Sequence, residues 1–363
     1  MADLNQLNGA LAHCVDADTG RDYLAMKAVR ELAIDAAGAV SLQIVLPYPA
    51  KSREAEIAAQ VQAALGKLDG VRSVAVQVSS RIEAHTVQRG LTPLPGVKNV
   101  IAVASGKGGV GKSTTAVNLA LALAAEGARV GLLDADIYGP SQPLMLGLQG
   151  QKPESPDGKS ILPMRAHGIQ AMSIGFLIDA EQPMVWRGPM VTQALMQLLN
   201  DTRWDDLDYL LIDLPPGTGD IQLTLSQKVP VTGAVIVTTP QDIALLDARK
   251  GLKMFEKVGV PVTGVVENMA MHICSQCGHV EAIFGEGGGG RMADEYQVEL
   301  LGLLPLEMSI RLATDTGKPS VAAEPEGKVA AIYKAIARKV AVKIGEKAKD
   351  FSAKMPKIVI QNT

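Results

Sequence analysis

The chain has 363 residues, of which 47% are hydrophobic, 20% are charged and 3% are aromatic, and its formal net charge is −3. This length allows one large or two moderate domains with an ample core. The acidic balance argues against a general nucleic-acid-binding protein, because neutralising phosphates requires a basic surface, and the scarcity of aromatic residues disfavours a base-stacking platform.

The N-terminal stretch MADLNQLNGALAHC has neither the basic region nor the apolar core of a secretory signal, and no apolar run reaches the length of a membrane span. The three cysteines form an odd count in a long chain, which fits a reducing compartment. We therefore expect a cytoplasmic protein that binds neither membrane nor nucleic acid.

Residues 1–85 predict a small α+β domain. The stretch SREAEIAAQVQAALGKLDG has helical spacing, with Ser52 as the expected N-cap and Gly70 as the expected stop. Strand-like runs flank it at 39–48 and 71–78. Residues 86–96 are rich in proline and glycine and read as a linker.

Residues 97–363 alternate between short apolar runs and helix-like segments. The runs at 99–105, 129–136, 208–217, 233–240, 261–269 and 299–307 are typical of parallel strands covered on both faces, and helices are expected at 113–127 and 242–259. This order predicts a doubly wound α/β fold with a mostly parallel sheet. The low-complexity stretch GEGGGG at 285–290 predicts a mobile loop.

The stretch SGKGGVGKST, residues 105–114, fits the phosphate-loop pattern G-x-x-x-x-G-K-[ST] after a strand and at the start of a helix. Lys112 would reach the β- and γ-phosphates, and the Ser113 hydroxyl would hold Mg²⁺. The remaining residues expected to surround the phosphates are Gly106, Gly108, Gly109, Val110, Gly111 and Thr114.

A second lysine, Lys107, gives this loop the form G-K-G-G-x-G-K-[ST]. That form resembles the deviant phosphate loop of the ParA, MinD and nitrogenase-iron-protein group of NTPases. The resemblance implies that Lys107 crosses a dimer interface and stabilises charge on the partner's phosphates, as an arginine finger does. We therefore expect a homodimer.

Carboxylates follow two other apolar runs. Asp213 ends LLID, where a Walker-B aspartate would hold Mg²⁺ through water. Asp134 and Asp136 lie in LLDADIYGPS, and the resemblance gives Asp136 the role of orienting the attacking water. Asn268 in ENMA matches the adenine-facing asparagine of the group, and no N-K-x-D motif for guanine is present, so ATP is the expected nucleotide.

Cys274 and Cys277 form a C-x-x-C pair in MHICSQCGH. The residues alone leave four interpretations open: incidental thiols, a redox pair, a zinc site completed by His272 and His279, or half of a Cys₄ set. In the last case a two-fold axis would bring two pairs together on one [4Fe–4S] cluster.

The deviant loop, DADIYGPS, DLPPGTGD, ENM, C-x-x-C and IFGEGGG occur in this order, and together they resemble the Mrp/ApbC family of P-loop ATPases. The resemblance covers about residues 97–320. It implies slow ATP hydrolysis coupled to carrying a cluster from assembly scaffolds to apo iron–sulfur proteins, with Cys274 and Cys277 as cluster ligands.

Residues 1–85 resemble the small domain of bacterial family members, which is related to iron–sulfur assembly factors. Those relatives carry an acidic D-P-E stretch and a reactive cysteine, whereas this chain has VDADTGRDY and no cysteine at the second place. Cys14 is expected in the first helix, as a packing residue and not as a ligand.

Two alternatives to a cluster carrier are a ParA/MinD-type positioning ATPase and a zinc-stabilised regulatory ATPase. The first would use a terminal amphipathic helix to bind membrane. The segment 327–351 is basic and amphipathic, but its apolar residues are mostly alanine and valine, so we expect it to pack on the core.

Overall fold

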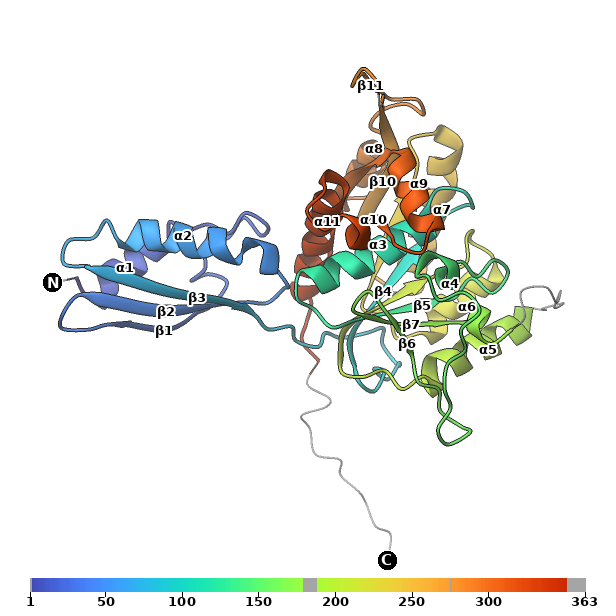
Figure 1. Cartoon of the computed structure of the whole chain (residues 1–363), viewed down its shortest axis with the longest axis horizontal. Coiled ribbons are helices and arrows are strands. Elements are labelled where there is room, and N and C mark those ends of the chain that lie inside the picture. The colour runs from blue at the N-terminus through green and yellow to red at the C-terminus, as the bar shows by residue number, and fades with distance from the viewer. Residues whose placement is uncertain (1, 179–187, 275, 351–363) are drawn as a thin grey trace, which may run out of the picture.

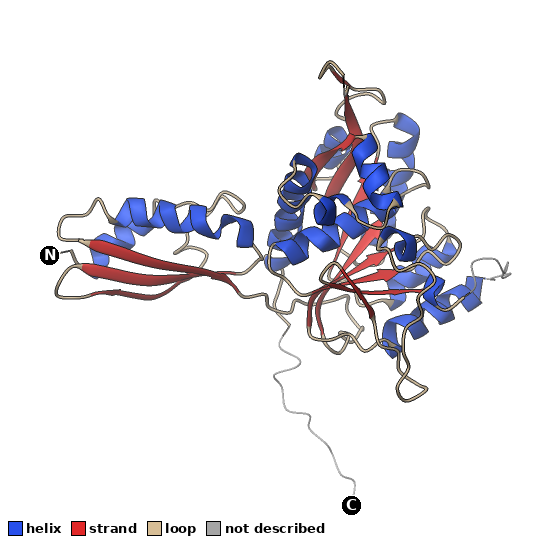
Figure 2. Ribbon diagram, viewed as in Figure 1, coloured by secondary structure: helices blue, strands red, loops and turns tan. Residues whose placement is uncertain are grey.

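The computed structural model describes residues 2–178, 188–274 and 276–350. A small unit of one helical layer and one sheet lies beside a larger α/β unit (Figure 1). Helices cover the large sheet, and a narrow hairpin projects from the large unit (Figure 2). The predicted combination of a parallel-dominated α/β fold with a small N-terminal domain is confirmed.

The small unit has a three-stranded sheet in the order β1-β2-β3. Strand β1 is antiparallel to β2, while β2 and β3 are parallel and joined through helix α2. Its elements are α1 (Leu4–Leu11), β1 (Val29–Ile34), β2 (Ala39–Leu46), the 3₁₀ turn η1 (Lys51–Arg53), α2 (Glu54–Leu65) and β3 (Ser73–Ser80). Helix α2 buries Ile57, Val61 and Leu65, whose spacing of four residues puts them on one face.

The boundaries of α2 differ from the prediction. Ser52 does not cap the helix, because its backbone N–H and its hydroxyl both donate to the carboxylate of Glu126, a residue of the large unit. The helix ends at Leu65 with Gly66 as its C-cap, and Gly70 lies in the following turn with φ of +91°. A long-range contact therefore replaced the local cap that the sequence suggested.

Cys14 follows α1 and does not lie within it. The sequence pattern gave the helix too many residues, because α1 ends at Leu11. The Cys14 side chain is buried, and burial raises the pKa of its thiol. Its expected role as a packing residue agrees with this position.

The large unit has a nine-stranded sheet in the order β11-β10-β9-β4-β8-β5-β7-β6, with β12 paired to β10. Among the described strand pairs of this sheet, only β6–β7 and β10–β11 are antiparallel. The strands are β4 (Val97–Ala104), β5 (Val130–Asp134), β6 (Met164–Ala166), β7 (Ile169–Ser173), β8 (Leu207–Asp213), β9 (Gly233–Thr238), β10 (Val262–Ile273), β11 (Val280–Glu281) and β12 (Glu299–Leu306).

Every residue of β5, β8 and β9 is buried, as their unbroken apolar runs indicated. The helices of this unit are α3 (Lys112–Ala125), α4 (Gln142–Met145), α5 (Gly188–Asp201), α6 (Asp220–Lys228), α7 (Asp242–Lys257), α8 (Gly288–Glu295), α9 (Met308–Asp315), α10 (Ser320–Ala323) and α11 (Lys328–Gly345), with the 3₁₀ turn η2 (Ile174–Phe176).

The glycine-rich stretch 285–290 was expected to be a loop, but its second half opens α8. Gly288 and Gly289 are buried there, and a Cβ on Gly288 would lie 2.7 Å from the Pro240 carbonyl oxygen. These glycines allow the start of the helix to pack closely against its neighbours.

Helix α11 packs on α3 and β12 through Tyr333, Ile336, Ala337 and Val340, which confirms the expectation that this amphipathic segment packs on the core. Over the described ranges, the helices are either too short or too polar to cross a bilayer.

Candidate functional site

The predicted nucleotide-binding residues meet at one edge of the large sheet. Strands β4, β5, β8, β9 and β10 are parallel neighbours, so their carboxyl ends lie at the same edge. The phosphate loop follows β4, Asp134 ends β5, Asp213 ends β8, and Asn268 lies in β10. This edge is where open α/β sheets bind ligands.

Glycines give the phosphate loop its shape. Gly109 and Gly111 have φ of +81° and +80°, a left-handed conformation that side chains with a Cβ rarely adopt. A Cβ on Gly106 would lie 2.1 Å from the Asp247 carbonyl carbon, and one on Gly111 would lie 2.2 Å from Asn268 Nδ2. Both glycines are therefore required by close packing around the loop.

Lys112 begins α3 directly after the loop and is buried. Its ammonium donates to Ser113 Oγ at 3.2 Å and forms an ion pair with Asp213. The Asp213 side chain is fully buried. The lysine and the serine were predicted from the phosphate-loop pattern and the aspartate from a strand-end pattern, and the lysine contacts both of the others.

Gln142 is a member of this cluster that the sequence did not suggest. Its Nε2 donates to Asp213 Oδ2 at 2.9 Å and to the Ser113 carbonyl oxygen at 3.1 Å. Its Oε1 is buried, and among the described residues it has no hydrogen-bonding partner. The only signal was its place directly after the GPS of LLDADIYGPS, because a lone glutamine carries no motif.

The two aspartates after β5 have different surroundings. Asp134 is fully buried and accepts hydrogen bonds from the backbone N–H groups of Ser141 and Gln142 and from the Ser173 hydroxyl. Burial, and then the charge of Asp213, raise its pKa to about 7. Asp134 thereby holds the turn that carries Gln142.

Asp136 is only half-buried, and burial raises the pKa of its carboxyl above the ordinary value. A carboxylate whose pKa is raised is better suited to accept a proton from water. Its position beside the buried cluster is compatible with the predicted role of orienting the attacking water.

Lys107 is the second residue of the loop and is half-buried. Within the described ranges its ammonium has neither a hydrogen-bonding nor an ionic partner. Gly108 and Gly109 beside it are exposed, and a Cβ on either would meet no atom within 4 Å. The contrast with the buried Lys112 leaves Lys107 free to reach a group outside this chain.

Asn268 supports the loop from β10, which is separated from β4 by β9. Its Nδ2 donates to the Val110 carbonyl oxygen at 2.9 Å, and its side chain is nearly buried. Ser113 and Thr114 at the start of α3 are half-buried. The adenine contact of Asn268 stays a prediction.

The C-x-x-C pair lies at the tip of the β10–β11 hairpin, the projection at the top of Figure 1. The Cys274 N–H donates to the His279 carbonyl oxygen, and the Gly278 N–H donates to the Cys274 carbonyl oxygen, both at 2.9 Å. Hydrogen bonds from the Cys277 and Gln276 backbone N–H groups are the largest causes that lower the pKa of the Cys274 thiol. Cys277 is exposed.

No third ligand joins these cysteines within the described part of the chain. Residues 2–178, 188–274 and 276–350 contain no group of three or more His, Cys, Asp and Glu side chains placed to hold a metal ion. The Nδ1 of His272 makes a hydrogen bond with the Leu306 carbonyl oxygen at 3.0 Å. The zinc set of two cysteines and two histidines is therefore not assembled by the described residues.

A glycine-built phosphate loop between a parallel strand and a helix, with a lysine and a strand-end aspartate in contact, defines a P-loop NTPase. The chain belongs to the family described as NUBPL iron-transfer P-loop NTPase, whose model matches residues 96–341. A second family, described as iron–sulfur cluster assembly protein, matches residues 5–78.

Two curated relatives are named iron–sulfur cluster carrier protein. One, from Pseudomonas fragi, is 62% identical over 278 residues, which are 76% of this chain and 97% of the relative. The other, from Escherichia coli K12, is 55% identical over 303 residues, which are 84% of this chain and 82% of the relative.

Among solved structures, a nucleotide-binding protein in complex with ADP from Archaeoglobus fulgidus is 39% identical, with a TM-score of 0.55. The match covers 61% of this chain and 88% of that protein.

Proposed function

We propose that this chain is an ATP hydrolase that carries a [4Fe–4S] cluster between two subunits of a homodimer and transfers it to apo iron–sulfur proteins. The names of its relatives support the carrier role, and the ADP-bound relative supports nucleotide binding. The ligands are Cys274 and Cys277 of each subunit.

One observation carries the proposal: at the hairpin tip, the half-buried Cys274 and the exposed Cys277 supply two of the four thiolates that a [4Fe–4S] cluster needs. Their hairpin tip supplies N–H groups that stabilise the thiolate of Cys274, and thiolate is the form that binds iron. No described residue supplies a third ligand. A tetrahedral set then needs a second pair, and the simplest source is the same hairpin of a second copy.

The nucleotide site has the parts that phosphoryl transfer requires. Asp136 accepts a hydrogen bond from the water that attacks the γ-phosphorus, and Lys112 stabilises the negative charge that moves to the leaving oxygen. Lys107, which has no partner among the described residues, reaches the phosphates bound by the second subunit. Each group acts by position and charge, with no covalent intermediate on the protein.

The same cluster suits Mg²⁺. Ser113 Oγ and the Asp213 carboxylate both contact the Lys112 ammonium, so two oxygen ligands converge on one place. The orphaned Gln142 Oε1 supplies a further acceptor for a bound water. Ser113, and Asp213 through water, would hold Mg²⁺ there, and the ion would supply positive charge beside the β- and γ-phosphates.

We further propose the division into an assembly-factor domain at 1–85, a linker at 86–96 and an ATPase domain at 97–363. The small domain docks partner proteins, which include cluster-assembly scaffolds. The protein acts in the cytoplasm, where thiols stay reduced.

The deciding experiment measures iron, sulfide and zinc per dimer after anaerobic reconstitution. The samples are wild type, the Cys274→Ser/Cys277→Ser variant and a Cys14→Ser control, whose cysteine is buried in the small unit. We expect about four irons and four sulfides per dimer in wild type and in the control, and background iron in the double variant.

Two results would contradict the carrier proposal. One zinc per chain, lost in the double variant, would indicate a zinc-stabilised regulatory ATPase. ATP hydrolysis with no metal in any sample would leave a positioning ATPase, although α11, the segment that such a protein would use on a membrane, buries its apolar face in the core.

A further inference from the structure

A groove lies between the small unit and the end of α11. It has a volume of about 480 Å³, which is the size of many small-molecule sites. One wall comes from the loop before β1 and the ends of β2 and β3, and the other from the last turn of α11 and the residues after it. Leu46, Tyr48 and Val342 give it a buried, largely apolar floor.

The rim of this groove is strongly basic. Its charged lining consists of five basic residues, Arg21, Lys27, Arg30, Arg81 and Lys349, and two acidic residues, Glu83 and Glu346. Both acids already have partners: Glu83 pairs with Arg81 at 3.3 Å, and Glu346 pairs with Lys343, which lies outside the groove, at 3.4 Å. The groove therefore has excess positive charge.

The other four cations have no carboxylate partner among the described residues. The guanidinium of Arg21 donates to the Ala25 carbonyl oxygen at 3.0 Å, and that of Arg30 donates to the Lys27 carbonyl oxygen at 2.6 Å. A concave surface lined by uncompensated cations attracts anions and concentrates them.

The backbone at the rim is held in an unfavourable conformation. Lys27 has φ of +54°, in the left-handed region that residues with a Cβ rarely adopt. The Lys27 N–H donates to the Leu24 carbonyl oxygen at 2.8 Å, and Arg30 binds the Lys27 carbonyl oxygen. Such strain gathers at ligand-binding and switch segments, where the surrounding structure maintains it.

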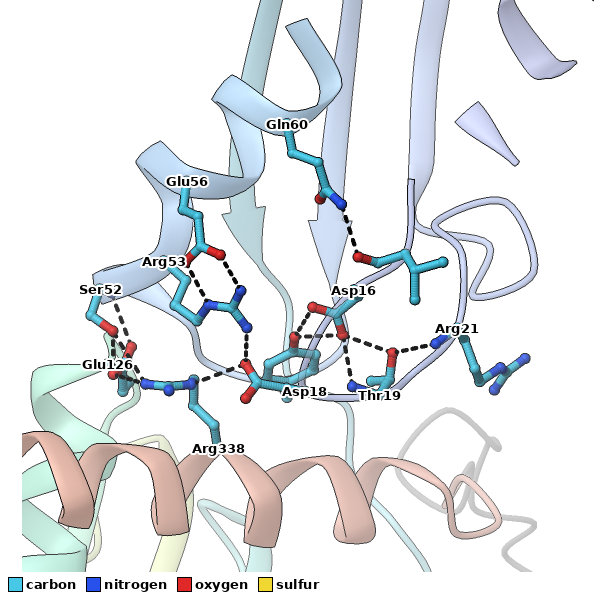
Figure 3. A network of polar contacts seen from close by, with 12 residues as sticks. Asp16, Asp18, Thr19, Arg21, Ser52, Arg53, Glu56, Gln60, Glu126 and Arg338 are labelled. Atoms are coloured by element: carbon cyan, nitrogen blue, oxygen red, sulfur yellow. Dashed lines mark hydrogen bonds and ion pairs between the residues drawn. The ribbon is translucent and has the colours of Figure 1, made fainter. Parts of the chain in front are cut away.

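A network of ion pairs and hydrogen bonds fixes the two walls relative to each other (Figure 3). The fully buried carboxylate of Glu126, at the end of α3, accepts hydrogen bonds from Ser52 at 2.6 Å and from Arg338 of α11 at 2.8 Å. Arg338 also pairs with Asp18 at 3.0 Å, and Asp18 pairs with Arg53 at 2.9 Å. The groove is therefore preformed, so a ligand need not order it.

We propose that this interdomain groove binds a small polyanion, a molecule that carries two or more carboxylate or phosphate charges. The apolar floor accommodates its carbon skeleton or bridging atoms, while Arg21, Lys27, Arg30 and Lys349 compensate its charges. None of the residues that line the groove belongs to the phosphate loop or to the cysteine hairpin, so the site is separate from both. It does not depend on the cluster-carrier proposal.

Isothermal titration calorimetry of the full chain at low ionic strength tests this site with two probes. Citrate represents polycarboxylates and inorganic pyrophosphate represents phosphates, and no nucleotide is added, because ADP is itself a small polyanion. The groove variants leave the phosphate loop intact, so they distinguish binding in the groove from binding in that loop. The variants are Lys27→Glu and Lys349→Glu. The matched control is Lys67→Glu, an exposed lysine at the end of α2 that makes the same charge change away from the groove.

We expect saturable binding of at least one probe at one site per chain. The dissociation constant should rise at least tenfold in each groove variant and stay within twofold in the control, and the better probe identifies the ligand class. Equal weakening by Lys67→Glu, or the absence of saturable binding of both probes, would overturn the proposal. The proposal would also be overturned if a hexaglutamate peptide bound and neither citrate nor pyrophosphate did, because the groove would then be a site for acidic protein segments.

Discussion

The phosphate loop and the cysteine hairpin differ in how much of the site one chain supplies. Asp213 contacts both Lys112 and Gln142 in a buried cluster, and the loop around them is fixed by glycine packing. Cys274 and Cys277 lie at the end of a two-stranded projection, and no third ligand lies near them in the described part of the chain. The described residues of one chain build most of the first site, and in the proposed dimer they supply half of the second.

The different burial of the two sites suits their different functions. A site that stabilises charge in a transition state benefits from fixed, desolvated groups, because they need no reorganisation during the reaction. A site that must release its cargo benefits from exposed ligands at a surface that another protein can reach. Lys107 lies in the phosphate loop but resembles the cysteines in one respect, because its ammonium has no partner among the described residues.

The largest expected effects are on ATP hydrolysis, and the stability of the fold distinguishes the two lysines of the loop. Lys112→Ala and Lys107→Ala should each lower the kcat of ATP hydrolysis roughly 100-fold or more, because each removes a cation from the transferred phosphoryl group. Only Lys112→Ala should also destabilise the fold, by about 3 kcal/mol, since it leaves Asp213 buried without its cation. Steady-state hydrolysis and chemical denaturation measure both effects.

The iron content after reconstitution is the control measurement for these two lysine variants. Lys107→Ala should keep the iron content of wild type, because the cysteines lie on a separate hairpin. A Lys107→Ala protein with a kcat within twofold of wild type would contradict a role for this lysine across the dimer.

The next effect tests how tightly the loop is fixed. Gly111→Ala should lower the free energy of unfolding by about 2 kcal/mol, because alanine disfavours φ of +80° and its Cβ would lie 2.2 Å from Asn268 Nδ2. Gly108→Ala is the matched control: a Cβ there meets nothing within 4 Å and the change should cost less than about 0.5 kcal/mol. Equal losses in urea denaturation would show that the loop is not fixed as described.

The smallest effect concerns the cysteines themselves. Backbone N–H groups lower the pKa of the Cys274 thiol, whereas burial raises that of Cys14. Iodoacetamide reacts with the thiolate form of cysteine. As the pH rises, Cys274 should therefore begin to react at a pH below the ordinary thiol pKa, and Cys14 only at a pH above it. Peptide mass spectrometry of the metal-free protein from pH 6 to pH 10 gives each rate, and an inverted order would refute the assigned hairpin geometry.

Much of the fold followed from the sequence because its signals are local. The unbroken apolar runs of β5, β8 and β9 and the complete phosphate-loop pattern each need only a few neighbouring residues to be recognised. Lys112, Ser113 and Asp213 then met, as predicted, because parallel strands place their carboxyl ends together.

The parts that failed depend on contacts between distant segments. Ser52 looked like a helix cap, but it binds Glu126, which is 74 residues away. Strand β1 was missed because its register with β2 shifts between Arg30 and Ala33, which breaks the alternation that marks a strand. Gln142 was missed because an amide becomes part of a site only through the fold.

Strand β10 joins the two sites through one stretch of backbone. Asn268 supports the phosphate loop, and Cys274 follows it by six residues, which corresponds to at most about 20 Å of extended chain. An insertion or deletion between them would change both the reach of the hairpin and the side of the strand on which the cysteines emerge. For the proposed nucleotide and cluster sites, the length of this segment therefore matters more than the identity of its residues.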